Sequence, residues 1–202
     1  DSNIGAKERV TQKRLIGLFQ DVLEYDYLGN WEYRESNSNV EETLLRRYLK
    51  RRKYADKEID KAVAKFKQAA ANIGAGLYNA NREVYTLLRY GVNVQSDVSE
   101  YKKTVHLIDW TNPMENDFQI AEEVTVQGKS DRRPDLVVYV NGIAVAVIEL
   151  KRSTVSVHEG IRQNIRNQQD EYIPRFFTTV QLLCAGNDTE GLHYGVIKTP
   201  EK

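Results

Sequence analysis

Two apolar runs joined by an Asn-Gly pair constrain the fold of this chain more than any other feature. The runs cover residues 136–140 and 143–150, and they are apolar at consecutive rather than alternate positions. Strands of this kind are usually buried on both faces, in the middle of a sheet. Asn141-Gly142 favours a tight hairpin turn, because both residues accept a positive φ. The pattern therefore predicts a buried β-hairpin at the centre of a sheet.

Charged side chains stand at the outer ends of the two runs. Asp135 precedes the first run, whereas Glu149 and Lys151 end the second. Glu149 and Lys151 are two residues apart in a strand, so their side chains leave the same face, with the Leu150 carbonyl between them. Phosphodiester hydrolysis needs a cation that neutralises the phosphate and lowers the pKa of the attacking water, and Mg²⁺ takes hard oxygen ligands. The pattern therefore indicates a metal site for phosphodiester hydrolysis.

The register of the hairpin decides whether this site can assemble. A tight two-residue turn would put Asp135 opposite Ile148, and therefore on the other face of the sheet from Glu149. A three-residue loop, with Gly142 left-handed in a bulge, would instead place Asp135 and Glu149 on one face as diagonal neighbours. We predict that bulge, or an equivalent distortion near Pro134.

A simpler interpretation is that these charged residues only cap the ends of a buried hairpin, since Pro-Asp and Glu-x-Lys segments are common. However, carboxylates at the edge of strands that are apolar on both faces need a partner or a metal, because an unpaired buried charge is costly. This context favours the metal site.

The residues before the hairpin predict a helical region that covers residues 1–91 and packs on the core. Helical spacing of apolar residues predicts helices over residues 8–24 and 79–90, with two more between them. Asn39 with Glu42 resembles a capping box for the second helix, and Asp56 is expected to cap the third. Gly91 is expected to end the fourth.

Residues 92–202 predict the core itself. A helix is expected over residues 157–173, where Pro174 closes it. Cys184 lies in an apolar run and is expected to be a buried thiol. Besides the hairpin, β-rich segments cover residues 104–110, 118–127, 180–185 and 194–198. The predicted fold class is therefore α/β, a mixed central sheet flanked by helices, with an N-terminal helical region.

Pro134-Asp135 followed by Glu149-Leu150-Lys151 resembles the signature of the PD-(D/E)xK nucleases. Further segments resemble the N-terminal nuclease domain of the type I restriction enzyme R (HsdR) subunit, namely Leu107-Ile108-Asp109-Trp110, Asn116-Asp117-Phe118, Gly160-Ile161-Arg162-Gln163-Asn164 and Ala185-Gly186-Asn187-Asp188-Thr189. The resemblance covers most of the chain and implies a restriction-endonuclease-like core.

The resemblance also implies an activity and its cofactors. Members of that family cut double-stranded DNA with Mg²⁺, for which Mn²⁺ can substitute, after ATP-driven translocation and in a complex with methylation and specificity subunits. ATP would bind in motor domains beyond residue 202, so this chain is expected to be a fragment of a longer one. By motif, Asp135 and Glu149 would be metal ligands, and Lys151 would orient or activate the water and stabilise charge on the phosphate.

The family carries a Gln-x-x-x-Tyr element after this site, and Gln168 with Tyr172 matches it. Both residues would lie on the stripe of the expected helix that faces the sheet. There they could contact DNA or brace Lys151, or they could only finish a packed face. Gln163 fits the element less well, because Asn167 stands four residues after it.

Several other residues leave alternatives open. A further acidic metal ligand could come from Glu8, Glu83 or Asp117, and the sequence does not choose among them. The basic run over residues 46–53 could interact with a helix C-terminus or steer DNA. Zinc is not expected, because the 3 histidines are far apart and the chain has 1 cysteine.

The balance of charge limits the function classes. The chain has 29 Lys and Arg residues and 29 Asp and Glu residues, so it has no overall attraction to nucleic acid or to an anionic membrane. No stretch approaches the roughly 20 apolar residues that a membrane span requires, and the first residues show no hydrophobic region of a signal peptide, so a soluble cytoplasmic protein is expected. A nuclease that partners deliver to DNA fits this balance, and this chain alone would then bind and cut DNA weakly. The alternatives are a structure-specific or repair nuclease of the same fold, and a docking module without activity.

Overall fold

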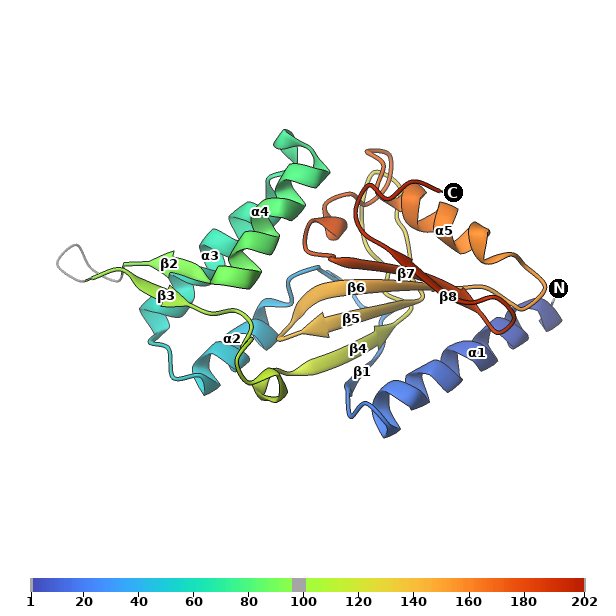
Figure 1. Ribbon diagram of the computed structural model, residues 1–202, viewed down its shortest axis with the longest axis horizontal. Helices are drawn as coiled ribbons and strands as arrows, with labels where there is room; N and C mark the ends of the chain where they lie inside the picture. Colours follow the sequence, from blue (N-terminus) through green and yellow to red (C-terminus); the bar gives the residue numbers. More distant parts are fainter. Residues whose placement is uncertain (1, 96–100, 202) are drawn as a thin grey trace.

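The central sheet is mixed and has 6 strands. The structure, a computed structural model, describes residues 2–95 and 101–201, but not the side chains of residues 2–8. Across the sheet the strands follow the order β1-β4-β5-β6-β7-β8 (Figure 1). Their bounds are β1 Asp26–Asn30, β4 Phe118–Glu122, β5 Leu136–Val140, β6 Ile143–Leu150, β7 Leu182–Asn187 and β8 Gly191–Gly195. The pairs β1·β4 and β6·β7 are parallel, and the other neighbours are antiparallel.

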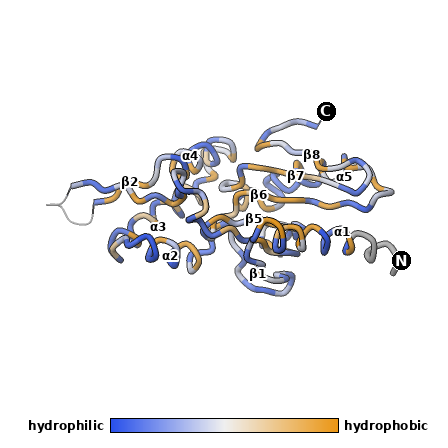
Figure 2. The backbone as a smooth tube through the Cα atoms, turned by 60° about the horizontal axis from the view of Figure 1, so that its bottom comes forward, coloured by the Kyte–Doolittle hydropathy of each residue, from blue (hydrophilic) through white to orange (hydrophobic). Residues whose placement is uncertain are grey.

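Helices cover both faces of this sheet. The helix α1 Ser2–Asp21 packs Ile16 against one face. The helix α5 Val157–Asn167 lies on the other face, so close that a Cβ on Gly160 would stand 3.0 Å from the Cβ of Ala185. In Figure 1, α1 runs below the sheet and α5 above it. The strands β5 and β6 are therefore buried from both sides, as predicted, and their hydrophobic stretches run through the interior (Figure 2).

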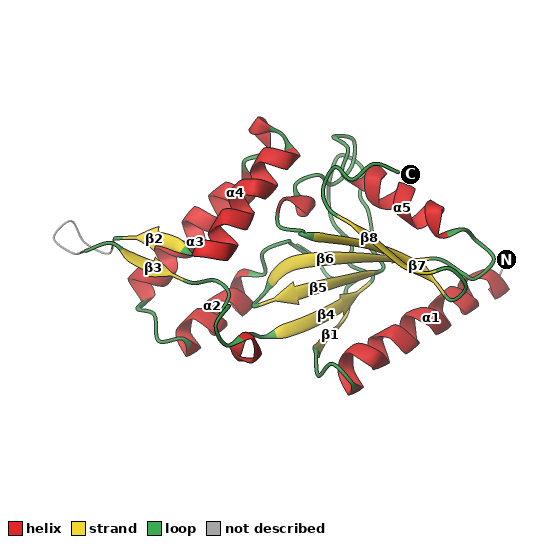
Figure 3. Ribbon diagram, viewed as in Figure 1, coloured by secondary structure: helices red, strands yellow, loops and turns green. Residues whose placement is uncertain are grey.

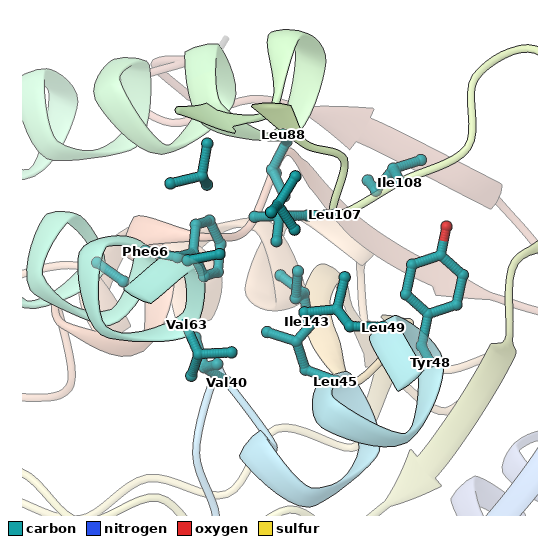
Figure 4. Close-up of a cluster of buried hydrophobic side chains, with 14 of the residues drawn as sticks. Val40, Leu45, Tyr48, Leu49, Val63, Phe66, Leu88, Leu107, Ile108 and Ile143 are labelled. Carbon is teal, nitrogen blue, oxygen red and sulfur yellow. The ribbon is translucent and has the colours of Figure 1, made fainter. Parts of the chain in front are cut away.

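A second group of elements, here called the helical lobe, packs at the hairpin end of the sheet (Figure 3). It consists of α2 Glu42–Arg51, α3 Asp56–Ala71, α4 Leu77–Tyr90, β2 Val92–Val94 and β3 Lys103–Val105. Its core contains Leu45, Leu49 and Phe66, and Ile143 of β6 enters it (Figure 4). A Cβ on Gly142 would stand 2.7 Å from the Cβ of Leu44, so the hairpin turn lies directly against α2. The end of the central hairpin is thus part of the core of the helical lobe.

The predicted helices form, but two of the predicted caps are wrong. The helix α2 begins at Glu42 after Glu41, and the Nδ2 of Asn39 instead donates to the carbonyl of Arg175 at 3.0 Å. Asp56 is the first residue of α3 rather than its cap. Gly91 follows α4 with a φ of 84°, as expected for a residue that ends a helix.

The first 91 residues are not wholly helical, because β1 pairs with β4 in the central sheet. No strand was predicted over Asp26–Asn30, whose residues are mostly exposed and do not alternate between apolar and polar. The N-terminal stretch therefore supplies an edge strand of the sheet, as well as the helix α1 that covers one of its faces.

Several elements differ in extent from the predictions. The strand β4 ends at Glu122, since Glu123 has a φ of 52° that breaks an extended strand. The strand β3 ends at Val105 rather than continuing to residue 110. The helix α5 ends at Asn167 rather than at residue 173, and the chain then turns so that Ile173 enters the core between sheet and loops. The last two strands, β7 and β8, are displaced by two or three residues from the predicted 180–185 and 194–198. The fold class remains the predicted one, a mixed sheet flanked by helices with a restriction-endonuclease-like core.

Cys184 is buried and free, as predicted, and burial raises the pKa of its thiol to about 11. Separately, none of the helices in the described residues combines the length and the apolar content that crossing a membrane requires.

Candidate active site

The central hairpin has a tight turn and a bulge in its second strand. Val140 pairs with Ile143, and Asn141 and Gly142 have φ angles of 53° and 81°, as a two-residue turn of this kind requires. The predicted three-residue loop is therefore wrong. Next to this turn Tyr139 pairs with Ala144, but Val138 pairs with Ala146, so the register shifts by one residue. Val145, which stands between Ala144 and Ala146, is the bulge. The distortion therefore lies in β6 and not near Pro134.

This bulge decides which side chains meet at the end of the hairpin. Leu136 pairs with Ile148, and the same register carried one step outward sets Asp135 opposite Glu149. The Oδ2 of Asp135 accepts a hydrogen bond from the backbone N–H of Leu150 at 2.6 Å. The two carboxylates therefore share a face, as the metal-site hypothesis needs, but as directly opposed residues rather than diagonal ones.

Gln163 joins Glu149 to Lys151. Its Nε2 donates to the Oε2 of Glu149 at 2.6 Å, and its Oε1 accepts from the Nζ of Lys151 at 2.7 Å. Gln163 comes from α5, which packs on the same face of the sheet as these side chains. The structure thus brings Asp135, Glu149 and Lys151 together and adds a glutamine that the sequence pattern ranked second.

The two residues preferred from the sequence lie elsewhere. The Nε2 of Gln168 donates to the carbonyl of Asn164, one turn back in its own helix, at 2.9 Å. Tyr172 follows the end of α5, so it does not share a helical stripe with Gln168, and the guanidinium of Arg132 lies 3.8 Å from its ring centroid. A signal in favour of Gln163 was present in the sequence, because Gly160, three residues earlier, marks the face of α5 that approaches the sheet closely.

Glu149 is under electrostatic strain. It is fully buried, and its pKa is raised well above the usual value, first by burial and next by the charge of Asp135, while Lys151 acts in the opposite direction. Its Oε1 has no hydrogen-bond partner among the described residues. A divalent cation would satisfy this oxygen and offset the repulsion between the two carboxylates.

The residues present fit Mg²⁺ better than a metal ion that the protein would have to coordinate entirely with its own side chains. Within the described part of the chain, no group of three or more His, Cys, Asp or Glu residues could hold a metal ion together. Mg²⁺ usually keeps several waters and binds through one or two carboxylates. Asp135 and Glu149 supply such a pair.

The further acidic ligands considered from the sequence do not join this pair. Glu83 is exposed on α4 in the helical lobe. Asp117 precedes β4 at the hairpin-turn end of the sheet, where it pairs with Arg51 at 2.7 Å. The side chain of Glu8 lies outside the described residues.

Glu123 is the acidic residue that does stand beside the pair. Its backbone N–H donates to the carbonyl of Asp135 at 2.8 Å, and its charge contributes to the raised pKa of Glu149. Its carboxylate forms an ion pair with the Nε of Arg133 at 2.8 Å and accepts a hydrogen bond from the Nε2 of Gln12 at 3.0 Å. The pattern of apolar runs did not single it out, because it follows β4 and not the central hairpin.

The basic run at the end of α2 is largely occupied by ion pairs. Arg46 pairs with Asp60 at 2.6 Å, and Arg52 pairs with Asp109 at 2.8 Å. Lys50 and Arg51 also face carboxylates, at 3.4 and 2.7 Å. Of the two interpretations left open by the sequence, this favours a structural role over DNA steering.

Comparison with known proteins gives a family. The family described as type I restriction enzyme R protein N terminus matches residues 5–202. The chain is 29% identical, over 169 residues, to a protein of Methanocaldococcus jannaschii named as type I restriction enzyme MjaIXP endonuclease subunit. It is 27% identical, over 114 residues, to the type I restriction enzyme SsaAORF53P endonuclease subunit of Staphylococcus saprophyticus.

These matches cover most of this chain but little of the relatives. They span 79% and 56% of this chain, but only 16% and 12% of the respective relatives. The aligned region is therefore a small part of each curated relative.

Proposed function

Because this chain belongs to the type I restriction enzyme R protein N-terminal family, we propose that it is the nuclease domain of a type I restriction-modification R subunit. Its site would hydrolyse phosphodiester bonds of double-stranded DNA with Mg²⁺, or with Mn²⁺ in its place, as in the PD-(D/E)xK nucleases. The observation that carries the proposal is the buried Glu149, which faces Asp135, leaves Oε1 without a partner and connects through Gln163 to Lys151.

Each residue of the site has a part in this chemistry. Asp135 and Glu149 would hold the cation, which when bound lowers the pKa of a water and neutralises the phosphate. Lys151 would stabilise the charge that develops on the phosphate, because a cation already held in place needs no reorganisation during the reaction. Gln163 would keep the Lys151 ammonium and the Glu149 carboxylate at a fixed separation, since it bonds to both.

The rest of the activity would depend on other parts of the complex. We propose that sequence choice belongs to specificity and methylation subunits, and that ATP is used by motor domains outside this chain. The 29 basic and 29 acidic residues support this division, because a cutter that is delivered to DNA has no need of strong attraction to it. Such a complex would work in the cytoplasm.

The test is cleavage of a plasmid that carries the target site by the full complex, with ATP hydrolysis followed in parallel. Asp135→Asn keeps an oxygen that can accept from the Leu150 N–H but removes the charge. We expect it, and Lys151→Ala, to reduce cutting by about 10²-fold or more while ATP hydrolysis persists. Exposed Asp21 and Lys53 give the matched controls Asp21→Asn and Lys53→Ala, which should cut normally. Cutting that survives both site substitutions would place the active site elsewhere.

A further inference from the structure

Two hollows in the surface meet at Tyr172. The larger, of about 670 Å³, lies between the helical lobe and the loops around residues 126–129 and 170–176. The second, of about 450 Å³, lies along α5 beside Ile165, Gln169 and Pro200. Tyr172 lines both hollows, so they lie side by side at this residue, and the two are here together called the depression.

The lining of this depression is basic, although the chain as a whole is neutral. The basic side chains that line it are Lys67, Lys129, Arg162, Arg166 and Arg175, against the acidic side chains Asp170 and Glu201. Lys67 pairs with Glu42 and Arg162 with Glu201. In the part of the chain that the structure describes, Lys129, Arg166 and Arg175 form no ion pair with a carboxylate. Their charges therefore remain available to an anionic ligand.

Arg132 adds a fourth such cation beside Tyr172, although it lines neither hollow itself. Its guanidinium lies 3.8 Å from the ring centroid of Tyr172. Its Nη1 donates to the carbonyl of Asp131 at 2.8 Å, and stacking on an aromatic ring leaves the other N–H groups at the edge of a guanidinium able to bind phosphate oxygens. A Cβ on Gly128 would overlap the carbonyl of Tyr172, so the loop that carries Arg132 lies directly on the segment after α5. The cations thus stand on two segments that hold each other in place.

Two segments connect the depression with the candidate active site along the chain. Arg166 stands one helical turn after Gln163 in α5. Arg132 stands three residues before Asp135, and its neighbour Arg133 bonds to Glu123 beside the carboxylate pair. The segments that carry Arg132 and Arg166 therefore also carry residues of the candidate active site, Asp135 and Gln163.

We propose that this depression, which Lys129, Arg166, Tyr172 and Arg175 line and beside which Arg132 lies, binds the phosphate backbone of duplex DNA and holds it at the nuclease site. This inference rests on the proposed function. Contacts of this kind fix position without reading sequence, which suits a nuclease whose sequence choice lies in another subunit. The few cations involved predict weak binding that falls steeply with salt.

The test measures DNA binding apart from cutting. The 202-residue chain is titrated against a short fluorescein-labelled duplex of arbitrary sequence, in EDTA to prevent cleavage, and anisotropy is followed from low to physiological salt. The variants are Arg166→Gln, Arg175→Gln and the pair together. The control is Arg47→Gln, an exposed cation on α2 that lies outside the depression.

We expect each substitution in the depression to weaken binding several-fold and to lower the slope of log affinity against log salt by about one unit. Arg47→Gln should bind as the wild type does. The proposal is overturned if the wild type does not bind the duplex at low salt, if the paired substitution leaves affinity and slope unchanged, or if a single strand of the same length binds more tightly.

The same titration separates this inference from the nuclease proposal. Asp135→Asn should bind the duplex as well as the wild type does, and yet fail to cut within the full complex. If Asp135→Asn binds DNA and also cuts normally, the nuclease assignment is wrong, but the proposed DNA-binding depression is not contradicted. If Asp135→Asn fails to cut but the paired Arg166→Gln and Arg175→Gln variant binds DNA unchanged, only the proposed DNA-binding depression is contradicted.

Discussion

Glu149 is the residue at which folding and proposed function conflict most directly. A fully buried carboxylate opposite a second one disfavours the folded state whenever it is ionised, because burial and the charge of Asp135 both raise its pKa. The hydrogen bond from Gln163 satisfies only one of its oxygens. Such a residue persists most readily where a bound cation offsets its charge.

Glu149→Gln should therefore stabilise the metal-free protein, with a gain that depends on pH. A raised folded-state pKa means that the stability contributed by protonated Glu149 is present at acid pH and is lost as pH rises through the folded pKa. Glutamine does not ionise, so the difference in Tm between variant and wild type should widen from about pH 5 to about pH 8 in EDTA. Thermal unfolding measures this, with the exposed Glu83→Gln as control. Adding Mg²⁺ should stabilise the wild type more than the variant; a Tm difference that is constant with pH would contradict the account.

At the scale of single elements, α5 determines the geometry of the site. Its N-terminus is fixed by Glu190, whose Oε1 accepts from the Val157 N–H at 2.9 Å, and this bond is the main cause of the lowered pKa of Glu190. Further along, the Nδ2 of Asn164 donates to the carbonyl of Cys184 at 2.8 Å. Gly160 lets the helix approach the sheet, so Gln163 reaches both Glu149 and Lys151.

Gln163→Ala should reduce both metal binding and cutting. It removes the hydrogen bonds to Glu149 and to Lys151, and loss of a group that orients metal ligands costs about 10-fold to 100-fold. The measurements are Mn²⁺ affinity of the 202-residue chain by electron paramagnetic resonance, and ATP-dependent cutting by the full complex. Gln168→Ala is the matched control, because its side chain bonds only back to its own helix at Asn164. If Gln168→Ala were the more damaging change, the sequence element and not the observed contacts would identify the functional glutamine.

At the scale of the molecule, the sheet and the helical lobe share a core. Ile143 belongs to the central hairpin by sequence, yet it lies in the same apolar cluster as Leu45 and Phe66 of the lobe. The turn residue Asn141 is fully buried as well, and its Nδ2 donates to the carbonyl of Leu107 at 2.9 Å. The sheet and the lobe are therefore expected to unfold together.

Ile143→Ala tests this cooperativity. Truncation of a fully buried isoleucine at the junction should cost about 2–5 kcal/mol of unfolding free energy. The fluorescence of the 2 tryptophans reports on the sheet and on the lobe separately. Trp31 packs in a sheet cluster, and the Nε1 of Trp110 donates to the carbonyl of Leu88 in the lobe. The Trp31→Phe and Trp110→Phe backgrounds each leave one tryptophan. In both backgrounds Ile143→Ala should lower the midpoint of denaturant unfolding by the same amount, whereas the exposed Val22→Ala should leave both midpoints unchanged. Different midpoints at the two probes would show that the parts unfold independently.

Local features of this protein could be predicted from its amino-acid sequence. The apolar runs and Asn141-Gly142 predicted the buried hairpin, and the charged residues at its ends predicted which side chains would meet. Helical spacing predicted the four helices α1 to α4, although α1 begins at Ser2 rather than at residue 8. These signals work because turn conformation and the periodicity of burial depend on residues that are near one another in the chain.

The strand register, the pairing of the edge strand and the choice of glutamine depend on tertiary packing. The bulge at Val145 sets Asp135 opposite Glu149, and nothing in the residues at that position distinguishes it from the rest of an apolar run. The strand β1 carries no alternation and forms by pairing with β4. Gln163 rather than Gln168 reaches the site because α5 packs closely on the sheet through Gly160 and ends at Asn167. Each outcome depends on packing between segments that are distant in the chain, and a local pattern carries no information about that packing.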